Sequence, residues 1–265
     1  MGDKIGSGAF GEVFQGLNSR NGQLFAVKRL KIVPGQAAEL ENLANEIDLM
    51  RTLVHPNIVQ YIGTKVDSVN EFVYIFQEWV PGGSVASLLE KFGPFQIGVI
   101  QTYTRQILLG LQYLHENGIV HRDIKGGNIL VENSGSVKLA DFGASAKMAM
   151  GETQETATIK GTPYFMAPEV LSQSRYGRKG DVWAVGCTVI QMLTGQPPWK
   201  VNNIQNIVQL HMLLSTMKEG PPKMDREVPE LMMDFLTVIF KKDPKERPSA
   251  AVLLTHPFLS TDDLD

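Results

Sequence analysis

The chain has 265 residues, 43% of them hydrophobic and 20% charged, and its formal net charge at pH 7 is −3. This length supports a substantial core in one or two lobes, and the near-neutral charge argues against electrostatic binding to nucleic acid or to an acidic membrane. No apolar run approaches the roughly 20 residues of a membrane span, so membrane insertion is not expected. The single cysteine, Cys187, excludes an internal disulfide and fits a reducing compartment, so we expect a cytoplasmic location.

The first part of the sequence is strand-rich, with one helix. Short segments rich in β-branched or aromatic residues predict strands at 12–17, 24–30, 58–64 and 71–79. A helix is predicted over about 36–53, where apolar residues recur at helical spacing: Leu40, Leu43, Ile47 and Met50. Any strand before Gly6 is expected to be almost missing, because only five residues precede that glycine.

Beyond residues 80–84, where the sequence Val-Pro-Gly-Gly-Ser predicts a hinge, the pattern becomes helical. One apolar stripe consists of Ile100, Tyr103, Ile107, Leu111 and Leu114 and ends at Asn117-Gly118, a typical C-cap. Residues 181–193 are apolar nearly all round and predict a buried central helix. Later helices are predicted around 203–218, 229–240 and 249–254.

The string Gly6-Ser7-Gly8-Ala9-Phe10-Gly11 has two possible uses. A dinucleotide fingerprint would need a helix next and an acidic residue about 20 positions on, but a strand follows and Lys31 stands there. We therefore favour a glycine flap between two strands, whose backbone N–H groups can approach phosphates closely.

Lys28 lies within the apolar strand segment Phe25-Ala26-Val27-Lys28, where an ammonium group needs an anion. It is either a phosphate-contacting lysine or an ordinary lysine on an edge strand, and the glycine flap before it favours the first. Glu46 falls within the apolar stripe of the predicted helix and is the candidate counter-ion. The alternative is a solvated carboxylate at the edge of that stripe.

The stretch 121–130, HRDIKGGNIL, crowds ionisable residues and an asparagine between apolar anchors. Asn128 and Asp141, which ends the strand-like segment 137–141, are ligand types suited to Mg²⁺. Asp123 is assigned as the carboxylate that receives the proton of an incoming hydroxyl, and Lys125 as the cation that neutralises a transferring γ-phosphate.

Taken together, these strings resemble a eukaryotic protein kinase domain across nearly the full chain. The matching motifs are the glycine-rich loop at 6–13, Ala26-Val27-Lys28, His121-Arg122-Asp123 with Asn128, Asp141-Phe142-Gly143, and Ala167-Pro168-Glu169. The resemblance implies an α+β bilobal kinase fold with a small strand-rich N-lobe, one key helix and a larger helical C-lobe. It also implies one kinase domain over 1–265, with the N-lobe at about 1–79, the hinge at about 78–83 and the C-lobe at about 84–265.

The resemblance further implies ATP and Mg²⁺ as cofactors, with Asn128 and Asp141 as the metal ligands. The residues that it places around ATP are Gly6, Ser7, Gly8, Ala9, Phe10, Gly11, Val13, Ala26, Lys28, Glu78, Val80, Asn128, Leu130 and Asp141. The same resemblance makes Asp181 an anchor for the catalytic loop and Arg247 the salt-bridge partner of Glu169. A lysine at the position of Lys125 resembles the catalytic loop of serine/threonine kinases. Gln77 stands before the hinge acid where an apolar residue is common, which should make the back of the adenine pocket more polar.

Finer strings resemble the MAP kinase kinase kinase group, the Ste11/MEKK-like kinases. They are 77–84, 103–111, 138–145, 186–190 and 194–199. The implied substrate is a MAP kinase kinase, phosphorylated on Ser or Thr of its activation loop, and an upstream kinase or activator is implied as well. The neighbouring Ste20-like kinases share some of these strings and form the alternative.

Residues 145–160 form a small polar loop with three threonines. We expect Thr158, three residues before Gly161, to be the activating phosphosite, with Arg122 able to clamp the phosphate; the alternative is an ordinary loop threonine. A pseudokinase scaffold is opposed by the presence of Lys28, Asp123 and Asp141. A small-molecule kinase of related fold is opposed by the complete protein-substrate segment 161–169.

Overall fold

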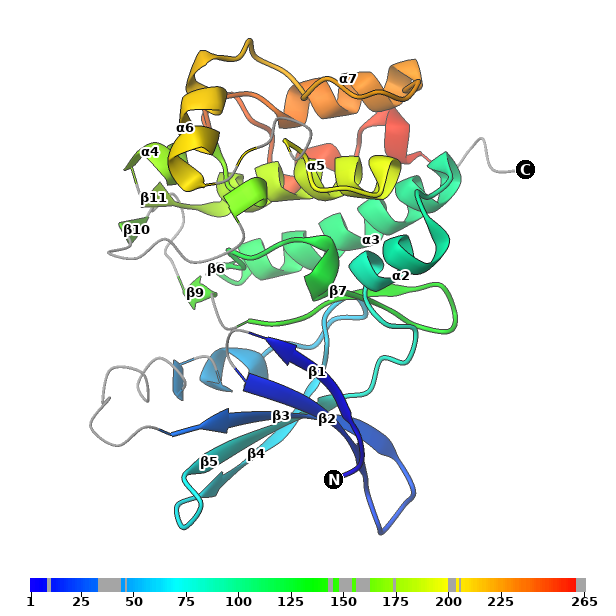
Figure 1. The fold of residues 1–265 in the computed structure, drawn as a ribbon, viewed down its shortest axis with the longest axis vertical. Coiled ribbons are helices and arrows are strands. Elements are labelled where there is room, and N and C mark those ends of the chain that lie inside the picture. Colours follow the sequence, from blue (N-terminus) through cyan, green and yellow to red (C-terminus); the bar gives the residue numbers. More distant parts are fainter. Residues whose placement is uncertain are drawn as a thin grey trace. The chain divides into compact units, whose positions relative to one another are not determined.

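The computed structural model describes residues 1–8, 11–32, 44–45, 47–142, 145–147, 154–155, 163–173, 175–199, 204 and 206–260. The chain divides into two compact units, Met1–Gly82 and Gly83–Asp265, which Figure 1 shows as a strand-rich part and a helix-rich part. This composition confirms the predicted α+β bilobal class.

The first unit contains a five-stranded antiparallel sheet in the order β1-β2-β3-β5-β4 (Figure 1). Its strands are β1 Lys4–Gly8, β2 Gly11–Leu17, β3 Leu24–Lys31, β4 Tyr61–Asp67 and β5 Phe72–Glu78. The predictions for β2, β3 and β5 are confirmed to within one residue at each end. The prediction for β4 was three residues too early, because the apolar Ile58 and Val59 are buried in the segment before the strand.

Only two residues of β1, Lys4 and Ile5, precede Gly6, as expected, but the strand continues through the glycine string to Gly8. Strand β1 has five residues, four of which pair antiparallel with β2, and the register is irregular between Lys4 and Gly6. The predicted helix over 36–53 is helical in its described residues 44–45 and 47–51, where Ile47 and Met50 are buried. Its earlier apolar residues, Leu40 and Leu43, lie outside the described residues.

The second unit is built on helices. They are α2 Val85–Phe92, α3 Ile97–Glu116, α4 Pro168–Gln173, α5 Arg178–Thr194, α6 Ile207–Thr216, α7 Glu230–Ile239 and α8 Ala250–Leu253. Three two-stranded ladders accompany them: β6 Ile119–Val120 with β9 Ala146–Lys147, β7 Ile129–Val131 with β8 Val137–Leu139, and β10 Gln154–Glu155 with β11 Arg175–Tyr176. The sequence had not predicted α2, whose first turn is closed by a reciprocal capping box between Ser84 and Ser87.

Helix α5 is the centre of this unit, and every residue from Gly180 to Leu193 is buried. That result confirms the prediction from its continuous apolar sequence. The helix ends at Gly195, whose left-handed backbone (φ 77°) is the conformation that glycine adopts without strain. Helix α3 likewise ends at Asn117 and Gly118, where the stripe was predicted to stop.

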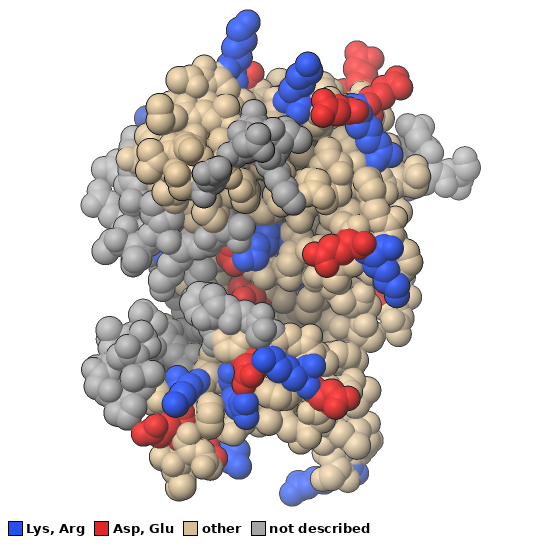
Figure 2. Space-filling model, in the orientation of Figure 1, with Lys and Arg blue, Asp and Glu red and all other residues tan. Residues whose placement is uncertain are grey.

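The distribution of surface charge agrees with the near-neutral net charge of the sequence, and the helices agree with the absence of a long apolar run. On the face drawn in Figure 2, described acidic and basic side chains are interspersed and form no large area of a single sign. Within the part of the chain that the structure describes, no helix is both long enough and apolar enough to cross a lipid bilayer.

Candidate active site

The glycine string of the first unit joins β1 to β2. Gly8 on β1 pairs with Gly11 on β2, and the two residues between them, Ala9 and Phe10, lie outside the described residues. Gly11 has φ 140°, and a Cβ atom there would lie 2.3 Å from the Arg29 carbonyl oxygen, so only glycine fits. A Cβ at Gly6 would meet no atom within 4 Å, which leaves that backbone approachable.

Lys28 lies in the middle of β3, paired with Val13 on β2 and with Ile75 on β5. Because strand side chains alternate between the two faces, Val13, Ala26 and Lys28 share one face of the sheet. Three of the residues predicted to surround ATP are therefore on one face of the sheet in the first unit.

The helix that carries Glu46 packs on this same face. Gln77, which shares the face of Ala26 and Lys28, donates a hydrogen bond from its amide to the Met50 sulfur at 3.3 Å. A thioether is a weak acceptor, so this contact satisfies the amide only in part, and the effect of Gln77 on the adenine pocket stays a prediction. Glu46 itself lies outside the described residues, and its pairing with Lys28 stays a prediction.

The predicted hinge begins at the last residue of β5 and continues into the segment after it. Glu78 is the last residue of that strand and donates its backbone N–H to the Gln60 carbonyl at 2.9 Å. Val80 is buried in the segment after it. In the second unit, Leu130 lies on β7 and bridges to Ser84. Their contacts with ATP stay predictions.

The catalytic loop is anchored by Asp181, as predicted. This carboxylate is fully buried in α5, and it accepts the backbone N–H of His121 at 2.9 Å and that of Arg122 at 2.8 Å. The His115 ring nitrogen Nε2 lies 2.9 Å from the same carboxylate. Arg122 has a left-handed backbone (φ 69°), which arginine seldom adopts, so these bonds hold a strained turn immediately before Asp123.

Asp123 is the centre of a three-residue cluster. Its Oδ2 atom accepts hydrogen bonds from Lys125 Nζ and from Asn128 Nδ2, both at 2.8 Å. Asn128 Nδ2 also donates to the Asp123 carbonyl oxygen at 2.8 Å. Because these two bonds use both N–H groups of the Asn128 amide, its Oδ1 atom is the one left to bind a cation. Oδ1 of Asp123 is the carboxylate oxygen that neither donor occupies.

A short turn places Asn128. Residues Gly126–Asn128 form one turn of 3₁₀ helix, and the Gly126 N–H donates to Gln191 Oε1 of α5 at 3.1 Å. A Cβ at Gly126 would lie 2.6 Å from that oxygen and 3.3 Å from the Ala86 backbone nitrogen. The first of the two glycines in the loop therefore allows a close approach to α5.

Asp141 is positioned by a buried aromatic contact. Phe142 is buried and packs against the His121 ring, with ring centroids 5.1 Å apart, and Nε2 of His121 lies 3.2 Å from the Ala140 carbonyl oxygen. Burial lowers the pKa of His121, against the opposing effect of nearby carboxylates, so the ring is neutral at pH 7. Asp141 has φ 62°, a left-handed conformation that aspartate tolerates.

The role of Asn128 and Asp141 as ligands of Mg²⁺ stays a prediction. Among the described residues, no group of three or more His, Cys, Asp or Glu side chains could hold a metal. Asp141 and Asn128 each carry a hard oxygen of the type that Mg²⁺ prefers, and Mg²⁺ characteristically completes its coordination with water and substrate phosphates.

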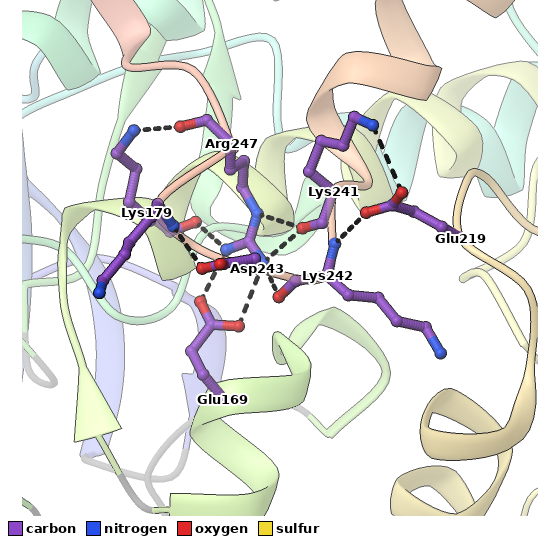
Figure 3. Close-up of polar contacts among 8 residues, drawn as sticks. Glu169, Lys179, Glu219, Lys241, Lys242, Asp243 and Arg247 are labelled. Carbon is purple, nitrogen blue, oxygen red and sulfur yellow. Dashed lines mark hydrogen bonds and ion pairs between the residues drawn. The ribbon is translucent and has the colours of Figure 1, made fainter.

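The segment predicted to build the protein-substrate platform is locked to the core of the second unit. Glu169 of α4 accepts two hydrogen bonds from Arg247, from Nη1 at 2.7 Å and from Nη2 at 3.1 Å, which confirms the predicted salt bridge (Figure 3). Such a paired, two-point contact fixes orientation as well as distance.

Several predicted positions cannot be placed. Gly143, Thr158 and Gly161 lie outside the described residues, as do the other two loop threonines, Thr153 and Thr156. Conversely, sequence reasoning missed the contributions of His115, Gln191 and Lys179. Gln191 could have been found, because a glutamine in an otherwise apolar buried helix needs a hydrogen-bond partner.

Comparison with known proteins agrees with this geometry. The protein kinase domain family matches residues 1–259. The chain is 47% identical over 266 residues to mitogen-activated protein kinase kinase kinase A of Dictyostelium discoideum, covering 97% of this chain and 27% of that protein. It is 48% identical over 268 residues to an Arabidopsis thaliana mitogen-activated protein kinase kinase kinase 3, covering 98% of this chain and 40% of that protein.

A third relative is mitogen-activated protein kinase kinase kinase ANP1 of Arabidopsis thaliana, 48% identical over 267 residues, with 97% of this chain and 39% of that protein covered. The chain thus spans 27–40% of the length of these relatives. The chain belongs to the protein kinase domain family and, within it, is similar to MAP kinase kinase kinases over nearly its whole length.

Proposed function

We propose that this chain is the catalytic domain of a serine/threonine MAP kinase kinase kinase, which transfers the γ-phosphate of ATP to the activation loop of a MAP kinase kinase. The observation that carries the proposal is the Asp123 cluster, in which one carboxylate is held by Lys125 and Asn128 on a loop anchored to α5. A carboxylate fixed in this way suits a reaction in which positioning and charge neutralisation do most of the work.

In the proposed reaction, a substrate hydroxyl oxygen forms a bond to the γ-phosphorus while the bond from that phosphorus to the β,γ-bridging oxygen breaks. ADP leaves, and the hydroxyl proton passes to Asp123. Lys125 lies beside this carboxylate and supplies positive charge to the transferring phosphoryl group. This arrangement assigns the base and the neutralising cation to different side chains of one loop.

We assign the metal as Mg²⁺, which Asp141 and the Oδ1 atom of Asn128 would hold. When bound, it would neutralise charge on the β- and γ-phosphates. The donor set supports this choice, because both protein ligands are oxygens and the described residues provide no sulfur or histidine cluster.

In the first unit, the glycine loop from Gly6 to Gly11 and Lys28 are proposed to hold the ATP phosphates. The openness of the backbone at Gly6 supports the first role, and the position of Lys28 on one face with Val13 and Ala26 supports the second. Glu46 remains the proposed counter-ion of Lys28.

The tier in the cascade is supported by the relatives, three of which are named MAP kinase kinase kinases at 47–48% identity. The Ste20-like alternative is not favoured. The proposed partners are a MAP kinase kinase as substrate and an upstream kinase or activator, with Thr158 as the proposed activating phosphosite. The cytoplasm remains the proposed location.

A substrate panel tests the tier. Phosphate transfer from Mg·ATP would be measured to a catalytically dead MAP kinase kinase, to a peptide substrate of Ste20-like kinases and to a generic basic protein. We expect strong transfer to the MAP kinase kinase, on Ser or Thr of its activation loop. Transfer only to the generic protein would support protein kinase activity but contradict the assignment to the MAP kinase kinase kinases. Transfer only to the Ste20-like peptide would favour the Ste20-like alternative.

A further inference from the structure

Arg247 contacts three other segments of the second unit through one guanidinium group. Besides Glu169, it donates to the carbonyl oxygen of Lys179 at the start of α5 from Nη1 at 2.6 Å. It also donates to the Lys241 carbonyl after α7, from Nε at 3.1 Å and from Nη2 at 2.9 Å. The guanidinium carbon lies 5.0 Å from the centre of the Trp183 ring. Arg247 is fully buried, so these partners replace its hydration.

Lys179 returns the contact that Arg247 makes to it. Its Nζ atom donates to the Arg247 carbonyl oxygen, while the Arg247 side chain donates to the Lys179 carbonyl oxygen (Figure 3). The two residues are therefore cross-linked by side chain and backbone in both directions. This clasp fixes the backbone from which the Arg247 side chain reaches Glu169.

Lys179 is held at this place against an electrostatic cost. Burial lowers the pKa of its ammonium group, and the Arg247 guanidinium lowers it further. None of the ion pairs found among the described residues joins Lys179 to a carboxylate. A half-buried lysine beside another cation is unfavourable by itself, so its hydrogen bond to the Arg247 carbonyl must offset that cost.

The clasp acts on the segment that precedes and includes α4. Residues Pro163–Phe165 form a 3₁₀ turn, Met166 donates its N–H to the Pro163 carbonyl at 3.0 Å, and Val170 of α4 is buried. Glu169 lies in the first turn of α4, four residues after Phe165, and its carboxylate is the point at which Arg247 holds the segment. In the proposed function, this segment is the platform for the protein substrate.

We propose that Lys179 is a positioning residue for the protein substrate: by holding the Arg247 carbonyl, it fixes the Arg247–Glu169 pair and thereby the substrate platform at 163–169. This inference rests on the proposed kinase function for its effect on substrate binding. The clasp itself is a property of the fold and can be tested without activity.

The test compares Lys179→Met with Lys242→Met. Lys242 is a matched control because it too is a half-buried lysine whose Nζ donates to backbone carbonyls, those of Met217 at 2.6 Å and Ser215 at 3.3 Å. Figure 3 shows its side chain extending away from Arg247. Lys179→Arg, which keeps a cationic donor, serves as the conservative rescue.

Steady-state kinetics supply the first readout. We expect Lys179→Met to raise the KM for the protein substrate about three- to tenfold, which corresponds to the loss of roughly one hydrogen bond of ordinary net strength. The KM for ATP should change by less than about twofold, since the contacts of Lys179 and Arg247 described above involve none of the residues assigned to ATP. Lys179→Arg should recover most of the loss, and Lys242→Met should leave both constants near those of the unmodified protein.

Amide hydrogen exchange supplies the second readout, which does not depend on activity. Amides of residues 163–173 should exchange faster in Lys179→Met than in the unmodified protein, and not in Lys242→Met. Equal exchange in the two variants, or an equal rise in KM for ATP and for protein, would overturn the proposal. If the unmodified protein phosphorylates no protein, the proposed function fails, and the exchange comparison still decides the role of Lys179.

Discussion

Replacing Asp181 by asparagine should slow phosphoryl transfer without unfolding the protein. The carboxylate accepts two backbone N–H groups, from His121 and Arg122, at 2.9 and 2.8 Å, in a site with no solvent exposure. In Asp181→Asn, one oxygen becomes an NH₂ group. If the remaining oxygen stays on Arg122, the His121 N–H faces another donor and loses its acceptor.

The size of the effect follows from that single lost bond. A buried donor left without an acceptor costs about 1–3 kcal/mol, and loss of the charge on the remaining acceptor adds about 1 kcal/mol. The total of about 2–4 kcal/mol opposes the strained turn at Arg122 that precedes Asp123. Since each 1.36 kcal/mol is a factor of ten, kcat should fall by about 30- to 1000-fold if the whole penalty opposes the active loop.

The assay is kcat at saturating ATP, measured together with thermal unfolding to show that the variant folds. Asp225→Asn removes the same charge from an exposed position in the second unit and serves as the control. A folded Asp181→Asn variant with kcat within about twofold of the control would refute the view that α5 holds the catalytic loop in its working geometry.

Three further changes test the packing around the site. Arg247→Met leaves the carboxylate of its partner unpaired and should lower the free energy of unfolding by about 3–5 kcal/mol in urea denaturation; a loss below about 1 kcal/mol would contradict a buried clamp. The pKa of Glu12 is lowered to about 2 by hydrogen bonds from Lys4 and Arg29. Its stabilising contribution should therefore be complete above its ordinary pKa of 4.5 and disappear as pH falls through about 2, so unmodified protein and Glu12→Gln should differ in stability at pH 6 and converge near pH 2. Gly11→Ala would place a Cβ 2.3 Å from the Arg29 carbonyl oxygen and should raise the KM for ATP, and an unchanged KM would contradict the need for glycine at this turn.

The sequence was most informative where one periodicity or one motif decides the structure. Helix α5 was predictable because its residues are apolar on every side, and α3 because its stripe ends at Asn117-Gly118. The cluster of Asp123, Lys125 and Asn128 was predictable because residues so close in sequence have little freedom to separate.

Other features depend on contacts between distant segments, which no local pattern reports. The strand β4 was predicted too early because Ile58 and Val59 are apolar and buried although they precede the strand. An apolar pair gives the same sequence pattern whether or not its backbone joins a sheet. The clasp between Lys179 and Arg247 joins positions 68 residues apart in the chain, and nothing in the local sequence distinguishes this lysine from a solvated one. Helix α2 was missed because its hydroxyl cap resembles the end of a hinge.

The central claim is that Asp123 receives the hydroxyl proton during phosphoryl transfer, and Asp123→Asn tests it most directly. The measurement is the single-turnover rate of phosphate transfer from Mg·ATP to the MAP kinase kinase, with ATP affinity measured on the same protein as the check on folding. The account predicts a fall of about 10²–10⁴-fold in the rate with ATP affinity nearly unchanged. A folded Asp123→Asn protein that binds ATP and transfers phosphate within about tenfold of the unmodified rate would contradict it.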